Sequence, residues 1–329
     1  MIGVVLPQRF HSFFFVRSGL LARSAAPRRQ HLRSISSSTV TLNNDHILLR
    51  HDDVENAVTT LTLNNPKKYN VLSSAMLDEL QLQLDDIAKN ESISVCIIAG
   101  TGKAFSAGHD LKEIHLHKTN EDTVSLFRKC SKVMMSVNKL PQPVIAKVNG
   151  VAAAAGCQLG ESVCCCASHI FSVHSIIELS FNLYTIYTYC TVAACDLAVA
   201  ANEATFGVTG INVGLFCSTP AVALSRNIQR KQAMHMLLTG DLISSEQAVV
   251  YGLINKAVPM ESLETETMAL AKKISNKSSF AIQLGKEMFY NQLKCDHLAD
   301  AYEFATEKIA ANFQHDDAKK GISSFVNKT

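Results

Sequence analysis

The sequence lacks a strong net charge of either sign. It has 31 Lys and Arg against 29 Asp and Glu in 329 residues, so its formal net charge is +2. A protein that binds nucleic acid through phosphate contacts carries a basic patch or stripe, and this balance therefore argues against a nucleic-acid partner. The hydrophobic fraction of 47% supplies enough apolar material for a large core in one or two domains.

Acidic residues are absent from the first 44 positions. This stretch holds six arginines, with serines and apolar residues between them, and the first acid is Asp45. An Arg-rich, Ser-bearing, acid-poor leader is typical of a mitochondrial transit peptide, whereas a secretory signal needs an unbroken apolar run. We expect residues 1–37 to direct the chain to the mitochondrial matrix and to be removed. A disordered basic tail is the alternative.

Metal-ligand spacing is missing among the ten cysteines. Cys164, Cys165 and Cys166 are contiguous, so they cannot converge on one ion as spaced ligands do. We expect no metal site, and in a reducing compartment the thiols should be free and mostly buried.

Apolar periodicity predicts alternating strands and helices in the first half of the chain. Strands are expected at 58–63, 95–99 and 144–148, and helices at 73–88 (with Ser73 or Ser74 as N-cap) and 124–137. This alternation indicates an α/β fold with right-handed crossovers.

The second half of the chain is mainly helical. Helices are expected at 228–239 and 245–251, a short strand at 254–258, and a helical pattern from 262 onwards with breaks near 276–279 and 295–296. The chain therefore divides into an α/β core, residues 45–275, and a C-terminal helical region, residues 276–329.

Two segments rich in small residues follow predicted strands: Lys103–Glu113 (KAFSAGHDLKE) and Val148–Leu159 (VNGVAAAAGCQL). Small residues let a backbone approach a ligand closely. The second segment is expected to run into a helix, so its free N–H groups would face the ligand. Each turn could offer one N–H to a developing enolate oxygen. Tight packing is the plainer explanation of such turns.

These segments resemble the two signatures of the crotonase superfamily, an A-G-x-D loop and a G-x-x-x-G-G-G-C-type turn. Four further stretches resemble family motifs in the same order: Asn65–Leu72, Gly210–Gly214, Leu238–Pro259 and the 316–325 stretch DDAKKGISSF. Together they cover most of residues 50–329. The resemblance implies an α/β crotonase fold, a spiral of ββα units, with a C-terminal all-helical region that mediates a homotrimer or hexamer.

The same resemblance implies the ligand and its contacts. The ligand is an acyl-CoA thioester, with no separate cofactor, and the oxyanion donors carry over to the amides of Ala107 and Ala155. The expected substrate and coenzyme A contacts are Lys68, Tyr69, Ala107, Gly108, His109, Asp110 and Gly156.

The two glutamates that hydratases of this family use on water are missing. Gln158 and Gly210 occupy the matching positions, and an amide or a glycine cannot act as a general base near neutral pH. His109, which titrates near neutral pH, is a candidate, although a histidine in the pocket wall is the plainer interpretation. Asp110 is expected to cap or brace its loop.

Residues 160–191 depart from the family pattern. This 32-residue stretch has no Lys or Arg, and joining Leu159 directly to Val192 restores a continuous family sequence, GCQLVAACDLAVA. We interpret it as translated non-coding sequence or a splice variant, with a functional inserted loop as the alternative. Polar residues such as His169 and Glu178 interrupt it, which disfavours a membrane span.

The expected function is therefore acyl-CoA binding in mitochondrial fatty-acid and lipid metabolism, with weak or no enoyl-CoA hydratase activity. One alternative is an active hydratase/isomerase, lyase or acyl-CoA hydrolase that uses non-standard residues. Another is a non-catalytic regulatory scaffold, which would have no need of paired amide donors.

Overall fold

Apolar, β-branched segments build a six-stranded sheet. The computed structural model describes residues 46–156, 184–186 and 189–327, which belong to one compact unit, Asp45–Thr329. The strand order is β1 (Leu48–Asp53), β2 (Val58–Leu63), β3 (Val95–Gly100), β5 (Val144–Val148), β8 (Leu197–Ala201) and β11 (Lys256–Val258). β1 pairs antiparallel with β2, and the other neighbours are parallel. The predicted strands 58–63, 95–99 and 144–148 are confirmed, and the one at 254–258 is shorter than predicted.

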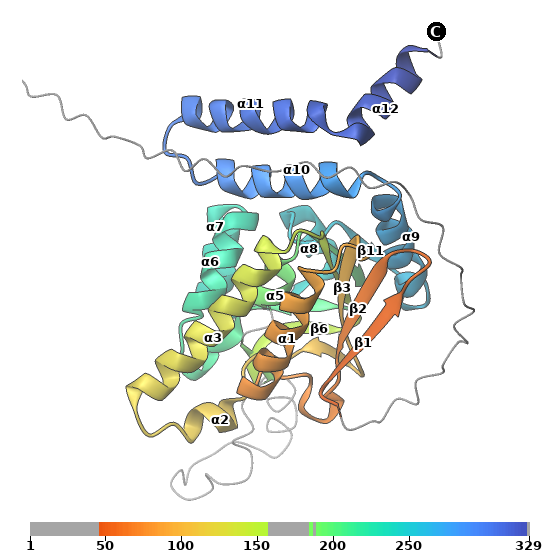
Figure 1. The fold of residues 1–329 in the computed structure, drawn as a ribbon. Helices are drawn as coiled ribbons and strands as arrows, with labels where there is room; N and C mark the ends of the chain where they lie inside the picture. Colours follow the sequence, from red (N-terminus) through yellow and green to blue (C-terminus); the bar gives the residue numbers. More distant parts are fainter. Residues whose placement is uncertain (1–45, 157–183, 187–188, 328–329) are drawn as a thin grey trace, which may run out of the picture. The chain divides into compact units, whose positions relative to one another are not determined.

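Both faces of this sheet are covered, as the near-continuous apolar strands require. Val95, Ile97 and Ile145 point to one face and pack against Ala271 of α9 (Leu263–Ser275). The alternate residues belong to the main core with α1 (Ser74–Ile87) and α3 (Asn120–Lys139). Figure 1 shows α1 and α3 side by side over the strands. Ser73 caps α1 by accepting the Met76 amide, which confirms one of the two predicted N-caps.

A second sheet carries the two segments rich in small residues. Its order is β10 (Ile243–Ser244), β9 (Thr205–Gly207), β6 (Val151–Gly156) and β4 (Ala104–Ser106), and β7 (Tyr184–Ile186) pairs antiparallel with β6. The predicted helix after the second segment falls on residues 157 onwards, which lie outside the described residues. Residues 151–156 form a strand, and the next described helix is α5 (Tyr189–Ala194).

The remaining elements of the core are short helices. They are η1 (Pro66–Lys68), α2 (Leu111–His115), η2 (Thr209–Val213), α6 (Ser218–Asn227), α7 (Arg230–Thr239), α8 (Ser245–Tyr251) and η3 (Met260–Ser262). The predicted helix 228–239 is confirmed as α7 but begins at Arg230, because Ile228 and Gln229 are extended between α6 and α7. The predicted helix 245–251 is confirmed, with Ser244 as N-cap in a capping box and Gly252 left-handed at its end.

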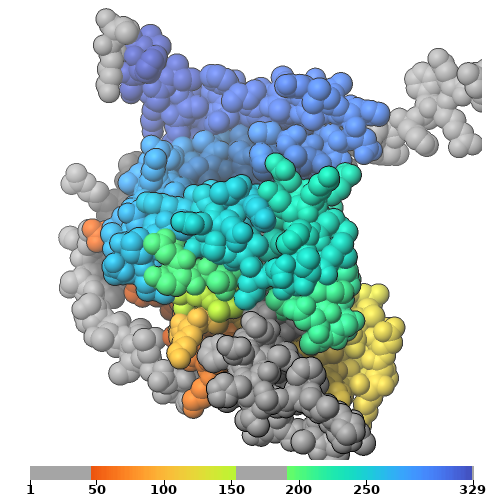
Figure 2. Space-filling model, turned by 180° about the vertical axis from the view of Figure 1, so that it is seen from behind, coloured from red at the N-terminus to blue at the C-terminus, as the bar shows by residue number. Residues whose placement is uncertain are grey.

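Three helices end the chain: α10 (Ser279–Gln292), α11 (Leu298–Gln314) and α12 (Asp316–Val326). The predicted breaks fall between α9 and α10 and between α10 and α11, and a further break at His315 was not predicted. Figures 1 and 2 show α10 and α11 running side by side. Among the residues that the structure describes, no helix is long and apolar enough to cross a membrane.

Candidate functional site

The loop after β2 is folded around the side chain of Asn70. Asn70 has a left-handed backbone (φ 54°), a conformation that asparagine tolerates better than most residues. Its amide is buried and donates to the carbonyl oxygens of Thr101 (2.8 Å) and Ala104 (2.9 Å), while its Oδ1 accepts the Asn65 amide at 2.8 Å. Asn70 therefore holds the loops that follow β2 and β3 together, a role that the motif comparison did not reveal.

The first predicted oxyanion turn lies directly against this loop. The amide of Ala107 donates to the Tyr69 carbonyl oxygen at 2.7 Å, and the Leu72 amide donates to the Gly108 carbonyl oxygen at 2.6 Å. Gly108 has φ 81°, which suits glycine, and its own amide contacts Ser106 Oγ at 3.3 Å. The N–H of Ala107, the first predicted oxyanion donor, therefore bonds within the protein, and a ligand oxygen would have to replace the Tyr69 carbonyl oxygen as its acceptor.

His109 is buried behind the turn. Its Nδ1 lies 3.1 Å from the Leu72 carbonyl oxygen, and its ring contacts the edge of Phe127 on α3 with centroids 4.9 Å apart. Burial lowers the pKa of His109 to about 4. The imidazole is therefore neutral near pH 7, and the expectation that it titrates near neutral pH is wrong.

Asp110 organises the end of the same turn. It is the N-cap of α2, and its Oδ1 accepts the Lys112 amide at 3.0 Å. Its other oxygen pairs with Lys68 Nζ at 3.0 Å. Glu113 accepts the Ser74 amide at 3.0 Å. The predicted capping role of Asp110 is confirmed, and Lys68, which remains 54% exposed, is oriented by it.

The second predicted turn leaves the same edge of the second sheet. β4 and β6 are parallel neighbours, with Ala104 opposite Val151 and Ser106 opposite Ala152, so their carboxyl ends lie together. The chain before β6 is also tied to the loop after β3: Asn149 Nδ2 donates to the Gly102 carbonyl oxygen at 2.7 Å, and a Cβ on Gly150 would lie 2.1 Å from the Lys103 carbonyl oxygen. Only glycine fits there.

The second predicted turn is described up to Gly156. Ala155 is opposite Thr185 and Gly156 opposite Tyr184 in the β6–β7 ladder, so the backbone of Ala155 lies in a strand and not at the start of a helix, as the sequence had predicted. Gln158 lies outside the described residues. β6 also contacts η2, which carries Gly210.

Gly210 brings no acid or base to this edge. It is buried in η2, and its carbonyl oxygen accepts the Leu215 amide at 2.9 Å. Nearby Cys217 is buried, and burial raises the pKa of its thiol to about 11, so it is not a thiolate at neutral pH. In the segments 104–113 and 205–219 the only carboxylates are Asp110 and Glu113, and both accept backbone amides. The described part of the site thus lacks a carboxylate placed to act on water.

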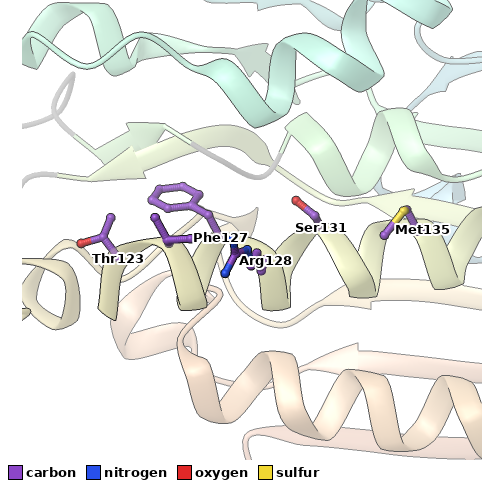
Figure 3. Close-up of a pocket in the computed structure, with 6 residues that line it drawn as sticks. Thr123, Phe127, Arg128, Ser131 and Met135 are labelled. Atoms are coloured by element: carbon purple, nitrogen blue, oxygen red, sulfur yellow. The ribbon is translucent and has the colours of Figure 1, made fainter. Parts of the chain in front are cut away.

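An open groove of about 510 Å³ runs along one face of α3. Figure 3 shows the side chains that line it. They are Thr123, Val124, Phe127, Arg128, Ser131 and Met135. Helical spacing puts residues 127, 131 and 135 on one face, so this stripe could have been found in the sequence. Phe127 joins the groove to the AGHD turn, because its ring also contacts His109.

Comparison with known proteins explains this arrangement. The enoyl-CoA hydratase/isomerase family model matches residues 53–193 and 189–329. The chain is 41% identical to mouse mitochondrial enoyl-CoA hydratase domain-containing protein 3 over 83% of its own length and 80% of the relative's. It superposes on an enoyl-CoA hydratase from Mycobacterium smegmatis with a TM-score of 0.73 at 40% identity, covering 86% of this chain and 97% of that one.

The crystal structure of human enoyl Coenzyme A hydratase domain-containing protein 3 is similar to the same degree, with a TM-score of 0.72 at 37% identity over 86% of this chain and 98% of that one. These likenesses extend through both sheets and the C-terminal helices. The two loops joined by Asn70 and Gly150, the AGHD turn and the following helices are therefore those of a crotonase fold, and the chain belongs to the enoyl-CoA hydratase/isomerase family.

Proposed function

We propose that this chain binds acyl-CoA thioesters and has weak or no enoyl-CoA hydratase activity. The observation that carries the proposal is Gly210, which lies in the element beside β6 where the family places a glutamate. A hydratase needs a group that takes a proton from water and another that returns one. Gln158 and Gly210 offer neither, whereas backbone amides at the sheet edge need no titratable group to polarise a thioester.

The proposed oxyanion donors are the amides of Ala107 and Ala155. The Ala107 amide bonds to the Tyr69 carbonyl oxygen, so a thioester oxygen would have to replace that carbonyl as its acceptor. Ala155 remains the proposed second donor. A ligand would then reach the Ala155 amide at the end of β6, next to the β7 ladder.

The groove on α3 is the proposed place for the acyl chain. It runs along α3 from Thr123 to Met135, and Phe127 within it touches the AGHD turn through His109. Its lining is mainly apolar, with hydroxyl groups from Thr123 and Ser131, as ligand grooves commonly combine them. The coenzyme A end is assigned to Lys68 and Tyr69, with Lys68 half exposed and so within reach of a phosphate.

A thioester panel tests the proposal. Isothermal titration with butyryl-, octanoyl- and palmitoyl-CoA should give measurable binding, and hydration of crotonyl-CoA, followed by loss of the enoyl absorbance, should stay close to the buffer rate. Rapid hydration by the unaltered chain would contradict the proposal. Restoring both carboxylates with Gln158→Glu and Gly210→Glu should raise the hydration rate, because the acid/base pair typically contributes a factor of about 10² to 10⁴.

The setting of this function is also proposed. The relatives named above include proteins described as mitochondrial, and the acid-free leader supports import into the mitochondrial matrix and a place in fatty-acid and lipid metabolism. A fluorescent fusion of the full chain should co-localise with a matrix marker. The same fusion without residues 1–37 should remain outside mitochondria.

Self-association through α10–α12 completes the proposal. Large apolar side chains of these helices are exposed, among them Leu298 (75%), Tyr302 (68%) and Phe325 (78%). Apolar surface of this extent marks an interaction site. We infer a homotrimer or hexamer in which these side chains pack between subunits.

A further inference from the structure

A polar cluster with little solvent exposure joins the first C-terminal helix to the amino ends of the sheet strands, at the opposite end from the ligand loops. Lys286 on α10 donates from Nζ to Asp196 Oδ2 at 2.6 Å, to the Gln142 carbonyl oxygen at 3.0 Å and to the Val137 carbonyl oxygen at 3.2 Å. Tyr290, one helical turn later, donates its hydroxyl to Asp196 Oδ1 at 2.8 Å. Two side chains of α10 thus share one carboxylate.

Asp196 also belongs to the core. It lies between α5 and β8, its Oδ2 accepts the Val144 amide at 2.7 Å, and its own amide donates to the Val144 carbonyl oxygen at 3.0 Å. The same carboxylate therefore holds β5 in register and receives α10. Breaking the cluster therefore disturbs the junction of β5, β8 and α10.

The charges of the cluster are fully paired. The side chains of Lys286 and Asp196 are 9% and 15% exposed, so water replaces few of their partners. An ammonium group has three donors, and that of Lys286 finds three acceptors. Removing one partner of such a pair leaves an uncompensated charge in a poorly solvated place, which is far costlier than losing an exposed pair.

Among the described residues of α10–α12, none is buried as the core residues are. A second polar contact to the core joins Ser279 Oγ on α10 to Ser94 Oγ before β3, at 3.2 Å. The Lys286 cluster, with side chains that are 9% and 15% exposed, is thus an enclosed contact between the C-terminal helices and the core.

We propose that Lys286, Asp196 and Tyr290 form an anchor that positions α10–α12 on the core, and that these helices detach as a unit when the anchor is broken while the α/β core stays folded. Lys286 and Tyr290 are positioning residues in this proposal. They touch no ligand loop, so the proposal stands independently of thioester binding.

Hydrogen-exchange mass spectrometry on the full chain tests the anchor. In Lys286→Met, amides of α10 should exchange at least about tenfold faster, while those of β3 and β5 change less than about threefold. Tyr290→Phe, which keeps the ring and the charge pair, should show the same pattern more weakly. The matched control is Lys308→Met, which removes the exposed Lys308–Glu287 pair (2.8 Å) from the same two helices and should leave α10 exchange unchanged.

Two results would overturn the proposal. If amide exchange accelerates equally in α10 and in the sheet, the cluster stabilises the whole core and does not specifically anchor α10–α12. If α10 exchange is unchanged in both Lys286→Met and Tyr290→Phe, the cluster does not anchor these helices. Should Lys286→Met fail to fold, the unaltered chain still decides the question. In that chain, the free energy of the opening that exposes the α10–α12 amides should depend less on denaturant concentration than that of the opening that exposes the sheet amides. The same dependence for both sets of amides would show that α10–α12 are not a separate unit.

Discussion

His109 and Asp110 are neighbours in the chain with opposite surroundings. His109 is enclosed between the AGHD turn and Phe127, whereas Asp110 faces the first turn of α2 and the partly exposed Lys68. Burial keeps the histidine neutral, whereas the carboxylate of Asp110 accepts backbone amides as the N-cap of α2. Both side chains hold the shape of the turn.

The pKa of His109 predicts a pH-dependent stability. Unfolding restores the ordinary pKa of 6.5, against about 4 in the folded chain. Between these values the unfolded state takes up a proton that the folded state does not, so the free energy of unfolding falls as pH falls below 6.5 and levels off below 4. The contribution lost between pH 7.5 and pH 5 is about 2 kcal/mol.

Urea unfolding of the unaltered chain and of His109→Asn at both pH values checks this. The asparagine amide can still donate to the Leu72 carbonyl oxygen but does not titrate, so the variant should lose about 2 kcal/mol less on acidification. Every other histidine is common to both proteins, and their contributions cancel in the comparison. Equal acid sensitivity would show that His109 is not the group responsible.

Asn70→Asp should destabilise the ligand loops severely. The change replaces a donor that serves three carbonyl oxygens with an acceptor, and it buries a charge. We expect a loss of about 3 to 5 kcal/mol in the free energy of unfolding. Asn64→Asp is the control, because Asn64 makes an exposed bond of 2.8 Å to the His46 carbonyl oxygen, and it should cost less than about 1 kcal/mol. Similar losses of unfolding free energy in Asn70→Asp and Asn64→Asp would contradict the role of Asn70 in holding the ligand loops together.

At the scale of elements, β6 and α5 are the parts that differ most from expectation. The family pattern joins the end of β6 to a helix that begins with Cys157 and Gln158, whereas here 32 residues separate Leu159 from Val192. α5 (Tyr189–Ala194) spans the end of this stretch and the first residues after it. A helix whose sequence is interrupted would bury less apolar surface and keep fewer hydrogen bonds than a continuous one.

Deleting residues 160–191 should therefore stabilise the protein. The continuous sequence GCQLVAACD would allow one helix to begin directly after β6 and to pack on α3 and α6, which α5 already contacts. We expect a higher melting temperature in differential scanning calorimetry and tighter acyl-CoA binding. The control is an internal deletion of comparable length that removes the connection between α10 and α11 together with the adjoining ends of both helices. This control deletion should lower the melting temperature. A deletion variant that melts no later than the full chain would reject the interpretation of this stretch as foreign. Transcript sequencing across residue 159 tests its origin.

At the scale of the whole molecule, the exposed face of the C-terminal helices requires a partner in the proposed assembly. Leu298→Glu and Phe325→Glu place charges on that face, and light scattering after gel filtration should show a shift from trimer or hexamer towards monomer. Lys294→Glu, a change at a polar surface position of the same region, should leave the mass unchanged. A monomeric unaltered chain at micromolar concentration would contradict the assembly.

Much of this protein could be predicted from its sequence. Strands 58–63 and 144–148 carry apolar runs bounded by turn residues, and their limits agree with the structure. Family motifs located the AGHD turn. Local patterns succeed there because a strand or a cap depends mainly on neighbouring residues.

Contacts between distant segments were decided by the tertiary structure. The Ala107 amide meets the Tyr69 carbonyl oxygen because Asn70 folds the β2 loop onto the turn, and His109 loses its charge because α3 packs over it. Lys286 finds Asp196, 90 residues away along the chain, because α10 crosses the strand ends. Donor availability, pKa and pairing depend on desolvation and on partners that no local pattern names. The sequence by itself determined the family and the local elements, because strands and caps depend on neighbouring residues. The folded chain determined the hydrogen-bond partners and the charges of the site residues, because these depend on distant contacts and on desolvation.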